Sequence, residues 1–454
     1  MAKVRQKRRL AFETQAESVK FFPPNPLRLD LWRMILFYNI FRVVYSIAVN
    51  LAALWNAKAK KWVEGRKNWQ QQLQQNWQPK PGNKVVWMHC ASLGEFEQGR
   101  PVLEKIKTQN PKSKILLTFF SPSGYEIRKN YNGADYVMYL PMDGASIAKN
   151  FIDLVQPDLA IFVKYEFWHY YLTELKKRKI ETVLVSGIFR PSQPFFQWWG
   201  GFHRNMLQNF SHLFVQNIAS KELLDGIGLN GKTTIAGDTR FDRVVEMADQ
   251  WQPVHYIDLF TDGFKILVCG STWKEDEEIL SLFLNENWQR WKLIIAPHEI
   301  NEPNIKRIKE LYPDSIRFSE LFNHDDLSLK ESLERHHTFI VDTIGHLSKL
   351  YKYASVCYVG GGFNKSGHHN ILEAAVYGKP VITGPNFEKF KESVDLKKTG
   401  GSFTIKNARE LIEVMRQMDV STAGTISENY VKENAGATSI IINWLQEKRL
   451  FTNA

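Results

Sequence analysis

The sequence predicts an α/β protein with two Rossmann-like domains, each built on a parallel sheet. Short, nearly continuous apolar runs alternate with helical stretches, which is typical of strands covered on both faces. Two sets of such runs follow one another, and 454 residues exceed what one core holds. Turns rich in glycine and hydroxyl residues follow several runs, where α/β proteins bind ligands.

A polar stretch at about 243–262, which contains Pro253, separates the two sets of predicted strands. The first set is Val85–His89, Ile115–Phe120, Tyr136–Leu140, Leu159–Val163, Thr182–Val185 and His212–Val215. The second is Ile266–Cys269, Leu293–Ala296, Phe339–Val341, Val356–Val359 and Val381–Thr383. We therefore expect a basic, poorly ordered tail (1–30), a membrane-associated helical segment (31–78), and domains at 79–245 and 246–454. A last helix, Thr438–Leu450, could pack back on the N-terminal domain.

The net charge of +11 calls for an anionic partner. Basic residues cluster before residue 70, and no stretch resembles a nucleic-acid-binding module, so an anionic membrane or lipid fits better than nucleic acid. The cluster comprises Lys3, Arg5, Lys7, Arg8, Arg9, Lys58, Lys60, Lys61, Arg66 and Lys67. Cys90, Cys269 and Cys357 show no metal-ligand spacing and are predicted to be reduced core residues of a cytoplasmic protein.

The longest apolar run, Met34–Trp55, is long enough to cross a bilayer. Polar residues nevertheless line one helical face, and an arginine at the bilayer centre costs about 2.5–3.5 kcal/mol. Trp55, Trp62 and Trp69 recur every seven residues, and tryptophan prefers the membrane interface. We expect a helix lying in the leaflet; a spanning anchor and a core helix are the alternatives. The polar positions are Asn39, Arg42, Ser46 and Asn50.

The stretch Val356–Pro385 reads as a strand, a triple-glycine turn, a helix start and a second strand. Glycines at 360–362 let the backbone approach a bound group, and Asn370 is a predicted N-cap whose helix start suits a phosphate. Glu373, in the first turn, could reach a ribose hydroxyl. A tight connection with ordinary capping is the alternative.

In the first domain, the segment His89–Glu97 places Glu95 just beyond a strand, with Gly94 expected to form a sharp turn. A carboxylate at this edge of the sheet can act as a general base. Ser92 and Glu95 also have the spacing of a capping box, so a purely helix-stabilising role is the alternative.

Further strand ends carry polar side chains that could contact a sugar or a phosphate. Ser121 and Ser123 could bind either group or form a simple turn, and Arg240 could clamp a phosphate or pair with Asp238 or Asp242. His298 could stack on a base. The turn Gly270–Glu277 leads into another helix start that suits a phosphate. The stretch Lys164–Trp168 is expected either to line a cleft or to pack at its rim, and Val341–Leu347 is expected to start a helix beneath the nucleotide.

In order along the chain, these motifs resemble the family of 3-deoxy-D-manno-octulosonic acid (Kdo) transferases of lipopolysaccharide synthesis, from about Met34 to residue 440. The motifs on which the resemblance rests are a membrane segment, a Ser-x-Gly-Glu turn, a Gly-Ser-Thr turn and a final Gly-Gly…Gly-x-His-Asn-x-Leu-Glu block. Between them lie Ser121–Gly124, Leu140–Asp143, Glu166–Trp168, Gly237–Asp242 and Asp342–Gly345.

The resemblance implies a GT-B glycosyltransferase at the cytoplasmic face of the inner membrane, with two domains facing a cleft. The donor would be CMP-Kdo and the acceptor the anionic lipid A precursor, with no metal or other cofactor at the transfer step. Glu95 would be the catalytic base. The acceptor side would hold Ser92, Gly94, Ser121, Ser123, Glu166 and Arg190. The donor-binding turns of the family fall on Ser271, Thr272, Gly361, Asn370 and Glu373. From their own positions in the sequence we add Arg240, His298, Gly345, Gly360, Gly362, Gly367 and His369 to the predicted donor side.

The sequence departs from the family pattern at three positions: Lys164 replaces an acidic residue, Trp273 a histidine and His368 a glycine. Three other functions therefore stay open. They are a GT-B enzyme that uses another nucleotide sugar, a nucleotide-sugar epimerase, and a membrane-bound binder of sugar nucleotides without catalytic activity.

Overall fold

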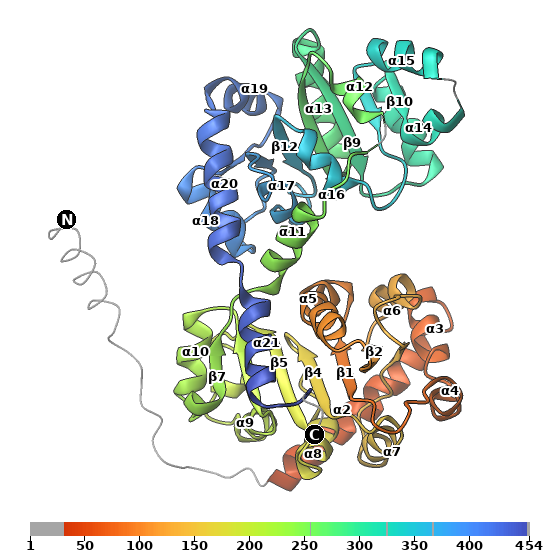
Figure 1. Ribbon diagram of the computed structural model, residues 1–454, viewed down its shortest axis with the longest axis vertical. Helices are drawn as coiled ribbons and strands as arrows, with labels where there is room; N and C mark the ends of the chain where they lie inside the picture. The colour runs from red at the N-terminus through yellow and green to blue at the C-terminus, as the bar shows by residue number, and fades with distance from the viewer. Residues whose placement is uncertain (1–30, 255, 324–325, 366, 452–454) are drawn as a thin grey trace, which may run out of the picture. The chain divides into compact units, whose positions relative to one another are not determined.

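The computed structural model describes residues 31–451 except 255, 324–325 and 366, so the predicted tail lies outside the described residues (Figure 1). The chain forms two compact units. The first unit comprises residues 1–96, 109–235 and 450–454, and the second comprises 97–108 and 236–449. Helix α11 (Thr239–Asp249) belongs to the second unit because Phe241 and Val244 enter that unit's core, whereas the sequence-based boundary follows residue 245.

The first unit holds a seven-stranded parallel sheet in the order β3-β2-β1-β4-β5-β6-β7. In Figure 1, β7 and α10 lie at one side of this sheet and α3, α4 and α6 at the other. The strands are β1 (Val85–Cys90), β2 (Lys114–Phe119), β3 (Tyr136–Tyr139), β4 (Leu159–Val163), β5 (Glu181–Gly187), β6 (His212–Val215) and β7 (Thr233–Ile235). The helices are α2 (Leu31–Ala52), α3 (Ala57–Glu64), α4 (Trp69–Asn76), α6 (Pro122–Arg128), α7 (Ala145–Val155), α8 (His169–Lys177), η1 (Pro194–Phe196), α9 (Gly201–Gln208), α10 (Ile218–Asp225) and η2 (Asn230–Lys232). Helix α5 (Leu93–Gln109) begins in the first unit, and its residues 97–108 belong to the second.

The second unit holds another seven-stranded parallel sheet in the order β10-β11-β9-β8-β12-β13-β14. Its strands are β8 (Lys265–Thr272), β9 (Trp291–Pro297), β10 (Ser315–Arg317), β11 (Thr338–Ile340), β12 (Val356–Val359), β13 (Val381–Thr383) and β14 (Ser402–Thr404). Besides α11, its helices are α12 (Ile257–Thr261), α13 (Lys274–Asn287), α14 (Glu302–Leu311), η3 (Phe318–Asn323), α15 (Asp326–Arg335), α16 (Leu347–Leu350), η4 (Tyr351–Tyr353), α17 (Leu372–Ala375), α18 (Lys391–Thr399), α19 (Ala408–Gln417), α20 (Val420–Asn434) and α21 (Ala437–Glu447).

The predicted fold class is confirmed, and each of the eleven predicted strand runs forms a strand. The strands that the sequence analysis did not predict, β7, β10 and β14, are the outermost members of their sheets. Each has three residues with few apolar side chains, because an edge strand is paired on one side only.

Helix α2 docks one face on the first unit and leaves the opposite apolar face exposed. Met34, Ile35 and Tyr38 pack against the core, and Asn39 Nδ2 donates a hydrogen bond to Tyr170 Oη at 2.7 Å. Trp32–Ala52 is apolar and long enough to cross a membrane, and none of it is fully buried. The exposed side chains are Trp32, Leu36, Phe37, Ile40, Phe41, Val43, Val44, Ile47 and Leu51.

The predicted stripe of interfacial tryptophans is wrong. Turns interrupt the chain after Ala52 and after Glu64, so Trp55, Trp62 and Trp69 do not share one helix. Only Trp55 is exposed, whereas Trp62 is buried and Trp69 packs against the core.

Arg66, expected in the membrane-facing basic cluster, is instead partly buried in a cage of carbonyl groups and aromatic rings. Its guanidinium donates to the carbonyls of Trp62, Leu140 and Phe120 at 3.1, 2.8 and 2.7 Å. The same group lies 3.9 Å from the centre of the Trp62 ring. Arg66 therefore holds the segment after α3 to the ends of β2 and β3.

Asp143 anchors the docked face of α2. Its carboxylate accepts hydrogen bonds from Tyr38 Oη at 2.6 Å and from the backbone N–H groups of Tyr170 and Tyr171 at 2.9 and 3.1 Å. Burial raises the pKa of Asp143 to about 6, against the effect of these hydrogen bonds. The folded chain thus binds this proton more tightly than the unfolded chain does.

We predict that Asp143 stabilises the folded chain most at pH 4 and that this contribution is lost as the pH rises to 6. A shift of about two pKa units from the ordinary value near 3.9 is worth about 3 kcal/mol. Urea unfolding of wild type and Asp143→Asn between pH 4 and 7.5 measures the difference in free energy of unfolding between the two proteins. The stability of wild type relative to the variant should increase as the pH falls. A difference that stays constant with pH would contradict this assignment.

Candidate functional site

Polar side chains of the first unit gather at the carboxyl ends of four adjacent strands, β2, β1, β4 and β5. Two backbone hydrogen bonds, Phe120 N to Cys90 O at 3.2 Å and Ser121 N to Ala91 O at 2.8 Å, join the loops after β1 and β2. The loop after β1 carries Ser92 and Glu95. We name this edge of the first sheet the Glu95 edge.

Glu95 lies in the first turn of α5 and is partly exposed. Ser92 Oγ donates a hydrogen bond to the Glu95 carboxylate. Gly94 does not form the expected turn, because it lies inside the helix and its φ is not positive. Gly94 is exposed, and a Cβ there would have only Ser92 Oγ nearby, at 3.9 Å.

Tyr165, which the sequence analysis did not assign to the site, also belongs to this edge. Burial raises the pKa of Tyr165, Arg190 lowers it and Glu95 raises it, so both charged groups lie within electrostatic reach of the phenol. The preceding residue, Lys164, has a φ of 67°, an unfavourable conformation for a residue with a Cβ. This strained turn sets the direction in which the chain leaves β4. Arg190 is exposed.

Glu166 is buried beneath this edge. Glu166 Oε2 accepts a hydrogen bond from Trp168 Nε1 at 2.7 Å and lies 2.8 Å from His89 Nε2. The other ring nitrogen of His89 lies 2.9 Å from Thr118 Oγ1. This network joins β1, β2 and the loop after β4, so Glu166 holds the loop that carries Tyr165.

Ser121 and Ser123 lie at the start of α6, and their hydroxyl oxygens are 2.7 Å apart. Ser123 is exposed and Ser121 is partly exposed, so both can contact a ligand. Gly124 has a structural role, because a Cβ there would lie 2.3 Å from the Phe119 ring.

In the second unit, the predicted donor residues follow the adjacent strands β11, β9, β8 and β12. Ser271 has a φ of 53° at the irregular end of β8, which marks a strained residue at the ligand edge of the sheet. Thr272 is buried, and its hydroxyl donates to Glu277 Oε1 at 2.8 Å. Gly345 is exposed, with a φ of 95° and open space around it.

The triple-glycine turn is shaped by contacts within the protein. A Cβ at Gly360 would lie 2.5 Å from the Ser271 carbonyl oxygen, and a Cβ at Gly362 would lie 2.5 Å from the Gly384 nitrogen. Gly361 has a φ of 89°. These contacts account for the three glycines without a ligand. Gly367, with a φ of 89°, is confined by Phe390 in the same way.

Asp276, in the first turn of α13, holds this turn in place. Its carboxylate accepts hydrogen bonds from Gly361 N at 2.9 Å, Trp273 N at 2.9 Å and Tyr358 Oη at 2.6 Å. Burial raises the pKa of Asp276, against the effect of these bonds. The N–H of Gly361 is therefore already used, and a phosphate bound here would need other donors.

A column of three rings stands at the same edge of the second sheet. Trp273 and His298 stack with their centres 4.5 Å apart, and His298 lies 4.6 Å from His369. Burial, together with His298 and His368, lowers the pKa of His369 to about 4, so His369 is neutral at pH 7. This column can stack against a flat group but supplies little charge to an anion.

The predicted N-cap is wrong by one residue: Ile371, not Asn370, is the N-cap of α17, and α17 is only four residues long. Asn370 Oδ1 accepts a hydrogen bond from Leu372 N at 3.1 Å, and its amide donates to Glu373 Oε1 at 3.2 Å. Burial raises the pKa of Glu373 and Asn370 opposes this. His368, the departure within this block, is buried and pins the loop to α18 through Ser393 Oγ at 2.7 Å.

Arg240 forms a salt bridge with Asp238, which is one of the alternatives predicted from the sequence. Its guanidinium donates to Asp238 Oδ2 at 2.8 and 2.9 Å and to Glu392 Oε1 at 3.0 Å. Although burial opposes ionisation, Arg240 holds the pKa of Asp238 below its ordinary value. Asp242 instead accepts hydrogen bonds from Gly436 N and Thr438 N at the start of α21.

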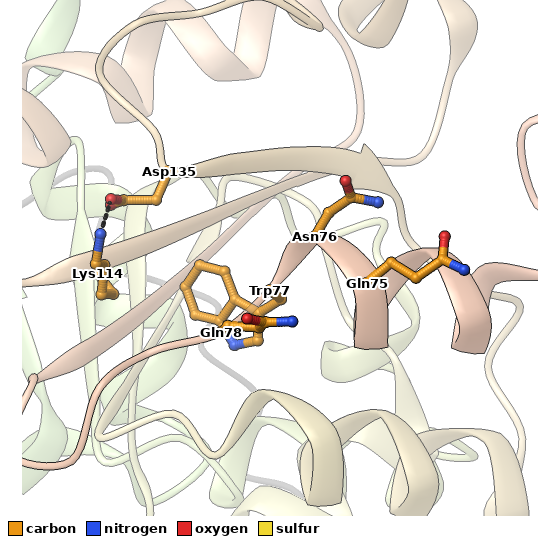
Figure 2. Close-up of a pocket in the computed structure, with 6 residues that line it drawn as sticks. All are labelled: Gln75, Asn76, Trp77, Gln78, Lys114 and Asp135. Atoms are coloured by element: carbon orange, nitrogen blue, oxygen red, sulfur yellow. Dashed lines mark hydrogen bonds and ion pairs between the residues drawn. The ribbon is translucent and has the colours of Figure 1, made fainter.

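A cavity of about 210 Å³ lies elsewhere, at the amino ends of β2 and β3 (Figure 2). Lys114 Nζ and Asp135 Oδ1 pair at 2.7 Å on one side of it, and the end of α4 supplies Gln75 and Asn76 on the other. Ligands of parallel sheets bind at the carboxyl ends, so this cavity is separate from the site. Within the described part of the chain, no three His, Cys, Asp or Glu side chains form a metal-ligand group.

Comparison with known proteins supports the family resemblance. Residues 67–243 match the profile of a family described as "3-Deoxy-D-manno-octulosonic-acid transferase (kdotransferase)". The chain is 24% identical over 403 residues to a 3-deoxy-D-manno-octulosonic acid transferase of Rickettsia prowazekii, covering 86% of this chain and 84% of the relative. It is 27% identical over 359 residues to a bifunctional glycosyltransferase/methyltransferase of Fusobacterium nucleatum, covering 76% of this chain but only 54% of that longer protein.

A solved structure confirms the fold. A UDP-GlcNAc 2-epimerase from Neisseria meningitidis superposes with a TM-score of 0.54 at 16% identity, covering 80% of this chain and all of the other. At this identity the likeness shows the architecture, two parallel-sheet domains of the GT-B type, and does not distinguish an epimerase from a transferase. The family profile and the Kdo transferase relative favour a transferase, because the chain is similar to Kdo transferases over most of its length and residues 67–243 match the profile of that family.

Proposed function

We propose that this protein transfers Kdo from CMP-Kdo to a hydroxyl of an anionic lipid A precursor, with inversion and release of CMP. The observation that carries the proposal is the Glu95 edge. There the partly exposed carboxylate of Glu95 accepts a hydrogen bond from Ser92, with Tyr165 and Arg190 within electrostatic reach of each other, in the part of the chain that matches the family profile.

In the proposed reaction, Glu95 takes the proton from the acceptor hydroxyl. The oxygen attacks the anomeric carbon of Kdo, the bond from that carbon to the phosphate oxygen of CMP breaks, and CMP leaves with the electron pair. Arg190 would attract an acceptor phosphate, and Ser121 and Ser123 would bind sugar hydroxyls. No metal ion takes part in this proposal.

The second unit would bind the nucleotide through Ser271, Gly345, Asn370 and Glu373, and the buried Thr272 would support the end of β8 through Glu277. Arg240 is saturated by two carboxylates, and the N–H of Gly361 is used by Asp276. We therefore assign both residues to shaping the site rather than to direct contact. The ring column of Trp273, His298 and His369 offers a stacking surface for the base or the sugar.

The exposed face of α2 would lie in the surface of the cytoplasmic leaflet of the inner membrane. A helix that crosses the bilayer alone must expose its whole circumference to lipid. In α2, Tyr38 and Asn39 instead contact the first unit. A flat orientation keeps these contacts and immerses only the apolar face. Arg33, Lys58 and Lys60 are exposed and would meet anionic headgroups.

A competition experiment tests the donor. We expect CMP to displace a fluorescent cytidine nucleotide from the protein at least tenfold more effectively than UDP does. Tighter binding of UDP would favour another nucleotide sugar and overturn the assignment of CMP-Kdo. Incubation with UDP-GlcNAc without lipid tests for an epimerase, and an epimerised sugar nucleotide would contradict the proposal.

A further inference from the structure

Two adjacent tryptophans, Trp198 and Trp199, project from the first unit between η1 and α9. Their side chains are 65% and 38% exposed, which is high for the largest apolar residue type. Neither residue belongs to the Glu95 edge described above. A pair of exposed tryptophans at one position calls for a partner that covers them.

The loop that carries the pair has a defined structure. Phe195 and Phe196 are buried in the first-unit core. Arg204 Nη1 donates to the carbonyls of Phe195 and Gln197 at 3.1 and 2.8 Å. Gly200 closes the turn, because a Cβ there would lie 1.9 Å from the Pro194 carbonyl oxygen. The tryptophans are thus held outward by a packed loop.

Ring contacts connect this loop to the docked face of α2. Trp199 lies 5.8 Å from His203, and the neighbouring Phe202 lies 5.7 Å from Tyr38 of α2. Phe202 also packs on His169, at 4.8 Å. The loop is therefore a neighbour of α2 within the first unit, next to the helix whose opposite face is apolar and exposed.

We propose that the loop 197–200, which we name the Trp loop, is a second membrane contact that enters the headgroup region beside α2. Tryptophan prefers this region because its ring is apolar and its N–H is polar. The exposed Arg190, which precedes the loop, adds the positive charge that an anionic surface attracts. A single helix would not fix the orientation of the first unit on the bilayer, whereas two separate contacts would. This inference rests on the proposed membrane placement of α2.

A site-specific fluorescent label tests the Trp loop directly. Cys90, Cys269 and Cys357 are fully buried, so Trp198→Cys in the full chain can be labelled selectively with an environment-sensitive dye. With vesicles of phosphatidylethanolamine and phosphatidylglycerol, we expect a blue shift and quenching by brominated lipid. The matched control is Trp288→Cys, a 51% exposed position in the second unit, whose label should stay in water.

Affinity gives an independent test. Trp198→Ala/Trp199→Ala should weaken co-sedimentation with these vesicles by about tenfold or more, since the two substitutions remove the exposed apolar surface of both rings from lipid contact. Trp288→Ala should bind as wild type does. A label at 198 that stays in water while the protein is vesicle-bound, or a double variant that binds normally, would overturn the proposal.

These assays contain no sugar nucleotide, so their failure leaves the proposed transferase activity untouched. Self-association that disappears in the double variant, with unchanged vesicle binding, would show instead that the loop contacts a second copy of the chain and would overturn the membrane assignment.

Discussion

Replacing Glu95 with glutamine is expected to lower kcat for Kdo transfer by about 10²- to 10⁴-fold, the usual contribution of a general base. Glutamine keeps the shape of the side chain and can still interact with Ser92 Oγ, but it cannot accept the proton. CMP binding and thermal stability should stay unchanged, because Glu95 is partly exposed and makes no buried ion pair. Steady-state kinetics with a lipid acceptor measure the effect.

The matched control for this prediction is Glu174→Gln. Glu174 lies on α8 of the same unit, where its carboxylate pairs with Arg178 at 2.7 Å. It has no role in the proposed reaction. We expect this variant to retain wild-type kcat. Near-normal turnover by both Glu95→Gln and Glu95→Ala would remove Glu95 from the role of base.

Replacing Arg240 with methionine is expected to destabilise the second unit by about 3–5 kcal/mol, the range for breaking one side of a buried ion pair. Asp238 and Glu392 are 7% and 6% exposed, and both would lose their cationic partner. Urea unfolding measures the loss.

The same variant separates a structural role from a donor-binding role. At low temperature, where the variant remains folded, the affinity for CMP should fall less than threefold if Arg240 only shapes the site. A large loss of CMP affinity with unchanged unfolding would show that Arg240 contacts the donor.

The sequence was sufficient for the fold because the central strands are apolar on both faces. Strands such as β1 and β4 read as uninterrupted apolar runs, whereas β7, β10 and β14 are short and lie at the sheet edges. The tryptophan stripe failed for another reason. A seven-residue period predicts a shared helical face only if the helix continues, and turns separate α2, α3 and α4.

The site was only partly predictable, because several of its residues act through partners that are distant in sequence. Asp276 pairs with Tyr358 and Gly361, which follow it by more than 80 residues, and Tyr165, Glu95 and Arg190 come from the ends of three different strands. The unfavourable φ of Lys164 and Ser271 is likewise invisible in the sequence. Glu95, by contrast, follows an apolar strand and starts a helix, which the motif alone predicts.

The most direct test of the central claim is transfer itself. Purified full-length protein is incubated with CMP-Kdo, a lipid A precursor in detergent micelles and a metal chelator, and the lipids are analysed by mass spectrometry. The proposed function predicts a lipid product that carries Kdo, release of an equal amount of CMP, and neither product with Glu95→Gln. Wild-type protein that binds CMP-Kdo but forms no Kdo-bearing lipid, with or without added divalent metal, would contradict it.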